Sequence, residues 1–174
     1  MNPVLETSRL ALRTLDLADL DFIAAMLAHP EVMRFWPRCY SRDQAEAWIR
    51  RQQDRYAQDG CGYWLAIDKA SGHPVGQAGI LILEIDGAVE AGLGYLIHRP
   101  FWQRGYATEA AAACCGYAFS ALGKPRIVAP IRPENAGSQA VARKLGMQPE
   151  RQTLYAGFDH LIFVLARATW ASQP

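Results

Sequence analysis

The residues best suited to chemistry lie in one short loop that contains the small residues Gly105 and Ala107: Gln103, Arg104, Gly105, Tyr106, Ala107 and Thr108. Apolar residues alternate from position 91 to position 97, which predicts a strand, and a helical pattern starts near Thr108. The free N–H groups and the dipole of a helix N-terminus attract anions, and Gly105 and Ala107 let a phosphate approach the backbone. We therefore predict a phosphate-binding loop, although an ordinary strand-to-helix junction has the same pattern.

Polar residues beside the next helix and the strand end are further candidates. Asn135 is suited to capping a helix predicted over residues 136–145, and Ser138 follows one turn later on the same face. His98 follows the strand and could accept a proton, or it could be an ordinary surface histidine. Arg104 and Lys144 could contact phosphate, or their charges could simply be solvated.

The preceding elements should place the loop at a sheet. Asp16 is suited to capping a first helix, and Ser41 with Gln44 has the spacing of a capping box for a second. After Gly62 the apolar period changes to two, and Asp86-Gly87 indicates a hairpin between two strands. Three antiparallel strands in sequence exclude a repeated strand–helix–strand nucleotide fold.

The second half should alternate helices with strands. A helix over residues 108–122 has a wide face of small side chains that can pack closely on a sheet. We expect strands at residues 126–130, 153–155 and 161–165, the last two paired across Ala156-Gly157. Two aromatic groups could line a site or only pack in the core: Phe35, Trp36 and Tyr40, and Tyr155, Phe158 and His160.

Composition predicts one soluble domain spanning residues 1–174. The 174 residues are 51% hydrophobic and 20% charged, which is ordinary for a globular protein. A net charge of +1 does not favour nucleic acid or an anionic membrane as a partner. No signal peptide or apolar span is evident, so we expect a cytoplasmic protein. The four cysteines lack metal-site spacing, so we expect no metal and buried or half-buried thiols at Cys39, Cys61, Cys114 and Cys115.

Two motifs carry a family resemblance. Residues 101–110, Phe-Trp-Gln-Arg-Gly-Tyr-Ala-Thr-Glu-Ala, closely resemble the acetyl-CoA loop of the GCN5-related N-acetyltransferases (GNAT), Gln/Arg-x-x-Gly-x-Gly/Ala. Residues 135–147 resemble the second motif of that family, Asn-x-x-Ser-x-x-x-x-x-Lys-x-Gly-Phe. The opening at residues 5–13 is similar to the ribosomal-protein-acetylating branch of the family. The resemblance covers nearly the whole chain.

The resemblance implies a fold, a cosubstrate and a set of site residues. The fold would be α/β (α+β), a mixed and mostly antiparallel sheet of about six or seven strands flanked by helices, with a splayed strand pair at the cofactor site. Acetyl-CoA would bind with its pantetheine arm between the strands ending at Ile97 and containing Ile127. The implied contacts are Leu96, Ile97, Gln103, Arg104, Gly105, Tyr106, Ala107, Thr108, Asn135, Ser138 and Lys144.

The implied reaction is direct attack of an amine on the thioester, with Ser138, Asn135 and His98 as the catalytic candidates. Trp102 replaces the first Gln/Arg of the loop motif, and Ala142 stands where many relatives have a tyrosine that protonates the leaving thiolate. Ser138 remains to act there. Proton acceptors for the amine could be Glu90, His98 or Glu31.

Three functions follow from these observations. The first is an acetyl-CoA-dependent N-acetyltransferase that acts on a protein N-terminus or on a small molecule, and that could form a homodimer. The second is a non-catalytic acyl-CoA-binding sensor or interaction domain. The third is a nucleotide-binding domain, but the chain lacks both the Gly-x-Gly-x-x-Gly and the Walker A spacing.

Overall fold

Two capping boxes set the start of the N-terminal helices in the computed structural model, which describes residues 3–172. The Asp16 and Asp19 carboxylates accept from the opening amides of a short 3-10 turn, and Ser41 and Gln44 cap the second helix reciprocally. The N-terminal elements are β1 (Leu5–Glu6), β2 (Leu10–Thr14), η1 (Leu17–Asp19), α1 (Leu20–Leu27) and α2 (Arg42–Asp59).

Three antiparallel strands follow as the period-two pattern predicts. They are β3 (Tyr63–Asp68), β4 (Pro74–Ile85) and β5 (Ala88–Ile97). Asp86 and Gly87 form the predicted hairpin turn between β4 and β5 with positive φ angles of 52° and 76°. These left-handed angles match the twist of the flanking strands, which is why this dipeptide is a strong hairpin signal.

The C-terminal half supplies the remaining helices and strands. They are η2 (Arg99–Phe101), α3 (Tyr106–Ser120), β6 (Arg126–Ile131), α4 (Ala136–Lys144), β7 (Gln148–Tyr155), β8 (Phe158–Ala166) and α5 (Arg167–Ala171). The described strands form one sheet in the order β1-β2-β3-β4-β5-β6-β8-β7. The pair β5–β6 is parallel, and the other neighbouring pairs are antiparallel.

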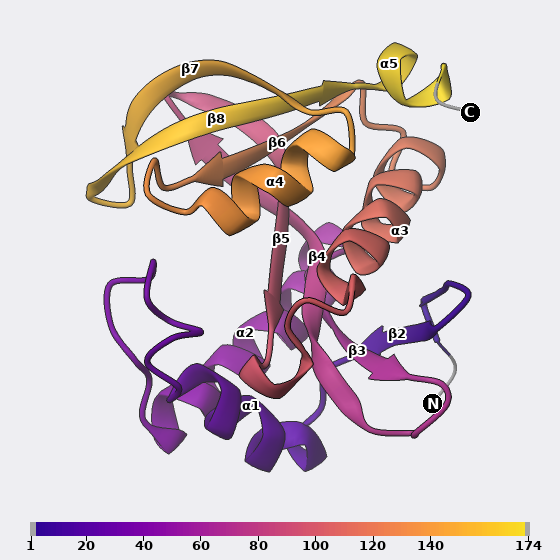
Figure 1. Cartoon of the computed structure of the whole chain (residues 1–174), viewed down its shortest axis with the longest axis vertical. Helices are drawn as coiled ribbons and strands as arrows, with labels where there is room; N and C mark the ends of the chain where they lie inside the picture. The colour runs from indigo at the N-terminus through magenta and orange to yellow at the C-terminus, as the bar shows by residue number, and fades with distance from the viewer. Residues whose placement is uncertain (1–2, 173–174) are drawn as a thin grey trace.

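Helices cover both faces of the sheet (Figure 1). Successive strand residues point to opposite faces, so Trp64 packs with α3 whereas Leu65 packs with α1 and α2. The small side chains Ala110, Ala111 and Cys114 are fully buried and let α3 lie close to β4 and β5. This packing fixes the start of α3 beside the end of β5.

Several boundaries differ from the sequence prediction. Within residues 3–172 the sheet has eight strands rather than six or seven, because the two-residue strand β1 was not predicted. The strands β7 and β8 are longer than predicted, since the exposed edge strand β7 begins with polar residues that carry no alternating apolar signal. The helix α3 begins at Tyr106, two residues earlier than predicted, directly after Gly105 with its positive φ angle.

Two smaller expectations also need correction. Cys61, Cys114 and Cys115 are buried free thiols as expected, but Cys39 is exposed in the segment between α1 and α2. The short helix α5 follows β8 directly and was not predicted. Within the described residues, no helix is long and apolar enough to cross a membrane.

Candidate active site

The loop before α3 presents a row of backbone amides. Gln103 and Gly105 have positive φ angles of 61° and 80°, and the helix begins directly after Gly105. Within the described residues, the N–H groups from position 103 to position 108 have no hydrogen-bond acceptor. Since a helix N-terminus also carries partial positive charge, this row of amides can hold a phosphate or a pyrophosphate.

Arg9 ties this loop to the N-terminal strands. Its Nη1 donates to the Arg104 carbonyl oxygen at 2.9 Å, and its Nε donates to the Glu109 carboxylate at 2.6 Å. The same carboxylate accepts a hydrogen bond from the Thr7 hydroxyl. On the neighbouring side, the Tyr106 hydroxyl donates to Asp68 at 3.1 Å. The amide row is therefore held from both flanks rather than free to move.

A cavity of about 670 Å³ lies in front of the amide row. It runs from the loop to α4 and the end of β5. The predicted cofactor contacts that line it are Leu96, Ile97, Gln103, Gly105, Tyr106, Ala107, Thr108, Asn135, Ser138 and Lys144. Arg104 does not line the cavity; its exposed guanidinium lies 5.7 Å from the centre of the Phe101 ring.

The predicted splayed strand pair is β5 and β6. These parallel strands are registered at one pair only, Gly92 and Val128, and they separate toward the end of β5. Figure 1 shows β5 running from the group formed by β6, β7 and β8 down toward α1. The backbone edge that β5 exposes beside the cavity can therefore bind an extended ligand.

Hydrogen-bond alternation decides which backbone groups face this gap. His98 N donates to Val75 O at 2.9 Å. Hydrogen-bonded and non-hydrogen-bonded residue pairs alternate along an antiparallel ladder, so Leu96 also bonds to β4, whereas the Ile97 N–H points away from β4. The Ile97 carbonyl oxygen accepts a 2.6 Å hydrogen bond from Trp102 Nε1. Trp102, which replaces the first Gln/Arg of the loop motif, thus supports the end of β5. The Ile97 N–H stays directed to the gap between β5 and β6.

Tyr95 and Ser138 meet across the gap. Ser138 Oγ donates to the Tyr95 hydroxyl oxygen at 3.0 Å, and the Tyr95 hydroxyl donates to the Ser138 carbonyl oxygen at 3.0 Å. Asn135 Oδ1 accepts from Ser138 N at 3.0 Å and so caps α4. Burial raises the pKa of Tyr95 to about 12, so its hydroxyl keeps its proton near neutral pH. All three residues line the 670 Å³ cavity.

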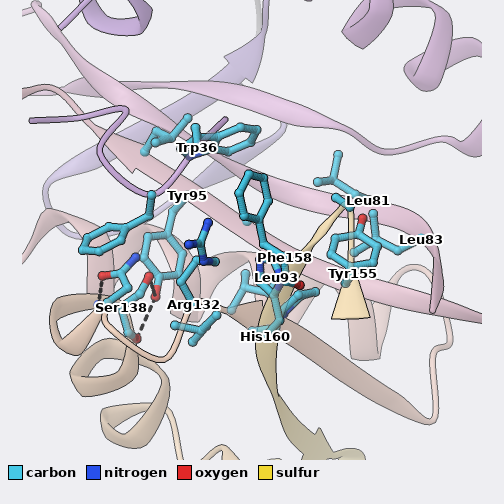
Figure 2. Close-up of a pocket in the computed structure, with 18 of the residues that line it drawn as sticks. Trp36, Leu81, Leu83, Leu93, Tyr95, Arg132, Ser138, Tyr155, Phe158 and His160 are labelled. Atoms are coloured by element: carbon cyan, nitrogen blue, oxygen red, sulfur yellow. Dashed lines mark hydrogen bonds between the residues drawn. The ribbon is translucent and has the colours of Figure 1, made fainter. Parts of the chain in front are cut away.

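A second cavity of about 410 Å³ lies on the other side of this pair. Tyr95, Leu96, Asn135 and Ser138 line both cavities, so the hydroxyl pair stands where they meet. Figure 2 shows aromatic side chains and Arg132 around this second space. Both aromatic groups identified in the sequence line it: Phe35, Trp36 and Tyr40 from one side, and Tyr155, Phe158 and His160 from the other.

The proton acceptors considered from the sequence lie elsewhere or are paired. His98 lines neither cavity, and its ring makes edge contacts with Phe22 and His29. Glu90 is buried and forms an ion pair with Arg126. Glu31 lines the larger cavity, but its carboxylate binds Arg99 Nε at 2.8 Å.

His160 is better placed to accept a proton. It lines the smaller cavity, and its Nδ1 lies 2.9 Å from the Phe158 carbonyl oxygen. Because a carbonyl only accepts, this contact assigns the proton to Nδ1 and leaves the Nε2 of the neutral ring as an acceptor. Sequence reasoning missed Tyr95, which stands in an apolar alternation, and Arg132, which follows a strand without any motif.

A family model described as an acetyltransferase (GNAT) domain matches residues 9–148. The chain belongs to the GNAT acetyltransferase family. The Bacillus subtilis protein YkkB is 33% identical over 144 residues, 82% of this chain and 84% of YkkB. The Bacillus subtilis protein named as uncharacterized N-acetyltransferase YoaA is 31% identical, covering 89% of this chain and 90% of YoaA.

Solved GNAT structures share the architecture. An acetyltransferase from Agrobacterium tumefaciens superposes with a TM-score of 0.81 at 27% identity, covering 96% of both chains. A ribosomal L7/L12 acetyltransferase in complex with coenzyme A superposes with a TM-score of 0.77 at 18% identity, covering 94% of this chain and 97% of that chain. At that identity the second likeness shows the fold alone, which confirms the predicted GNAT fold.

Proposed function

We propose that this GNAT protein transfers an acetyl group from acetyl-CoA to a primary amine. The observation that carries the proposal is the pair of cavities that meet at Tyr95 and Ser138. One cavity has an anion-binding amide row, and the other is lined mainly by aromatic and aliphatic side chains. Two substrates entering from opposite sides would bring their reacting groups together at the hydroxyl pair.

The residues of the larger cavity fit coenzyme A. The unpaired amides at positions 103–108 and the α3 dipole suit its pyrophosphate, and Lys144 adds a positive charge on the same wall. The exposed edge of β5 suits an extended pantetheine arm. The bound thioester would supply an activated acetyl group, and every other requirement of the transfer falls on the residues of the chain.

The junction can supply groups for three parts of the reaction. The Ile97 N–H is directed to the open strand edge, where it can donate to the oxygen that gains charge during attack. The amine nitrogen forms a bond to the acetyl carbon while the carbon–sulfur bond breaks. His160 Nε2 can take the amine proton and later release it to solvent, and Ser138 Oγ, hydrogen-bonded to Tyr95, can donate its proton to the leaving sulfur and be reprotonated from solvent.

Ala142 bears on the non-catalytic alternative. This residue is 1% exposed and lines neither cavity. A hydroxyl is nonetheless present at the junction, because Tyr95 supplies one from β5 rather than from α4. The missing helix tyrosine therefore does not argue for a sensor that has lost turnover. The ribosomal-protein branch, a homodimer and a cytoplasmic location stay predictions.

Release of free CoA thiol tests this proposal. The protein is mixed with acetyl-CoA and a panel of primary amines, and thiol is measured against enzyme-free and amine-free controls. We expect amine-dependent release together with mass-spectrometric detection of the N-acetyl product. Binding of acetyl-CoA without release for any amine would instead support the sensor, and binding of ATP or NAD without acetyl-CoA would support a nucleotide-binding domain.

A further inference from the structure

The smaller cavity has an unusual charge distribution for a site that receives an amine. Among the described residues that line it, Arg132 carries the one full charge, and there is no Asp or Glu. A substrate with several ammonium groups would find no carboxylate there to replace its lost hydration. The lining therefore disfavours polyamines and favours an acceptor with a negative group.

Arg132 is held so that its charge faces this space. It follows β6 directly, its side chain is 23% exposed, and its guanidinium stacks 4.3 Å from the centre of the Phe158 ring. Figure 2 shows the guanidinium directed into the space between Tyr95 and Phe158. The stacking on Phe158 holds the plane of the guanidinium and leaves the edge of that group available for a ligand.

The hydrogen-bonding capacity of Arg132 is incompletely used. Its Nε is buried and, within the described residues, has no hydrogen-bond partner. The nearest carboxylate is Glu134, whose oxygen is 3.7 Å away and whose side chain is 66% exposed. The enclosed Nε is out of reach of a ligand, so the exposed part of the guanidinium is left to bind one, and a guanidinium binds a carboxylate best through two parallel hydrogen bonds.

The rest of the wall sets the second property of the acceptor. Trp36, Tyr40, Leu83, Leu93 and Tyr155 surround the space with apolar surface. The volume of about 410 Å³ lies in the range of small-molecule sites, which is about 300–1,000 Å³. A single large apolar or aromatic side chain would bury its surface there, and a long polar chain would not.

We propose that the smaller cavity takes a small primary amine bearing both a carboxylate and a large apolar group, as in an aromatic or branched-chain α-amino acid. Arg132 binds the carboxylate, the aromatic wall holds the side chain, and the amine faces Ser138 and Tyr95. The proposal rests on the acetyl transfer proposed above. A polypeptide N-terminus lacks the adjacent carboxylate and is the competing acceptor.

The test compares acceptors that differ in one group. L-Phenylalanine, L-leucine, phenethylamine, L-phenylalaninamide and spermidine are offered with saturating acetyl-CoA, and thiol release is measured. We expect kcat/KM for L-phenylalanine to exceed that for phenethylamine and L-phenylalaninamide by about 10- to 100-fold, the range of one charged hydrogen-bonded contact. Spermidine should be the poorest acceptor.

Two variants separate the contact from general damage. Arg132→Gln should lower kcat/KM for L-phenylalanine by about 10- to 100-fold and leave phenethylamine unchanged within about twofold. Arg151→Gln is the matched control, because Arg151 binds Asp86 outside both cavities, and it should change neither substrate. Thermal unfolding with acetyl-CoA, run on each variant, shows that the fold and the larger cavity are intact.

The outcomes distinguish this inference from the function on which it rests. Equal or better turnover of phenethylamine, L-phenylalaninamide or spermidine would overturn the carboxylate site while leaving acetyl transfer standing. Binding of acetyl-CoA without turnover of either amino acid would also overturn it. Absence of any acetyl-CoA binding would contradict the proposed function itself.

Discussion

The hydroxyl groups of Tyr95 and Ser138 lie 3.0 Å apart and join the central strand β5 to the helix α4 at the junction of two cavities. The strand supplies a hydroxyl whose pKa burial raises to about 12, and the helix supplies a small hydroxyl that can turn toward a ligand. In this arrangement Ser138 Oγ donates to Tyr95 and the Tyr95 hydroxyl donates to the Ser138 carbonyl oxygen, so the serine hydroxyl reaches a ligand by turning away from Tyr95.

The first prediction concerns this pair as a unit. Ser138→Ala should slow turnover by about 10²-fold or less, because a thiolate whose conjugate acid has a pKa of about 8.5 leaves without much assistance. Tyr95→Phe should have a smaller effect. The double variant should be no slower than Ser138→Ala if the serine transfers the proton and the tyrosine orients it. Kinetics of all three variants check this, and fully additive losses would show independent roles.

The second prediction concerns the support of the amide row by Arg9. Arg9→Gln removes the bonds to the Arg104 carbonyl oxygen and to Glu109, so KM for acetyl-CoA should rise by about tenfold with little change in kcat. Arg42→Gln is the control, because Arg42 pairs with Asp21 at the exposed surface, and it should behave as wild type. A matching loss in both variants would contradict a specific role for Arg9.

The third prediction separates His98 from catalysis. Burial, followed by the nearby His29, lowers the pKa of His98. As the pH falls, the unfolded chain therefore takes up a proton at this histidine at a higher pH than the folded chain does. Stability from this site is present above the ordinary histidine pKa of 6.5 and is lost as pH falls through the folded value. His98→Asn should therefore reduce the loss of unfolding free energy between about pH 7 and pH 5.5.

Activity supplies the contrasting measurement for the same residue. Because His98 lines neither cavity, His98→Asn should keep kcat within about threefold of wild type. His160→Gln should lower kcat by about 10²-fold, the usual contribution of a general base. A large loss of kcat in a folded His98 variant, with normal turnover of the His160 variant, would reverse the two assignments.

The fourth prediction concerns the cap of α4. Asn135→Ala removes the acceptor for Ser138 N and should destabilise the fold by about 1 kcal/mol. Asn135→Asp keeps the acceptor and should restore stability. Chemical denaturation measures both values, and KM for acetyl-CoA shows whether the amide has a further role in binding. Equal unfolding free energies for the wild type and Asn135→Ala would show that the cap contributes little.

The sequence predicted elements best where local chemistry decides them. The capping box at Ser41, the turn at Asp86-Gly87 and the helix after Asn135 depend on neighbouring residues, and the structure has all three. The loop at 103–108 also has the expected form, with a helix beginning beside a positive-φ glycine. Such features need no knowledge of the distant chain.

Side chains brought together by the sheet topology could not be predicted in this way. Tyr95 and Ser138 are 43 positions apart, and their contact depends on where β5 and β6 separate. The Arg132 guanidinium lies over the ring of Phe158, which begins the distant strand β8. His98 follows the strand end as a catalytic residue could, but its ring packs against Phe22 and His29 instead. No local pattern encodes these tertiary contacts.

Thermal unfolding with acetyl-CoA tests the central claim most directly. Acetyl-CoA at about 100 times its dissociation constant should stabilise the wild type by about 2.7 kcal/mol, and ATP and NAD should not. Gly105→Val, with φ 80° beside the amide row, should abolish this gain, whereas the control Gly123→Val, with φ 63° and open space around it, should retain it. No shift in the wild type, or equal shifts in both variants, would contradict acetyl-CoA binding at this loop.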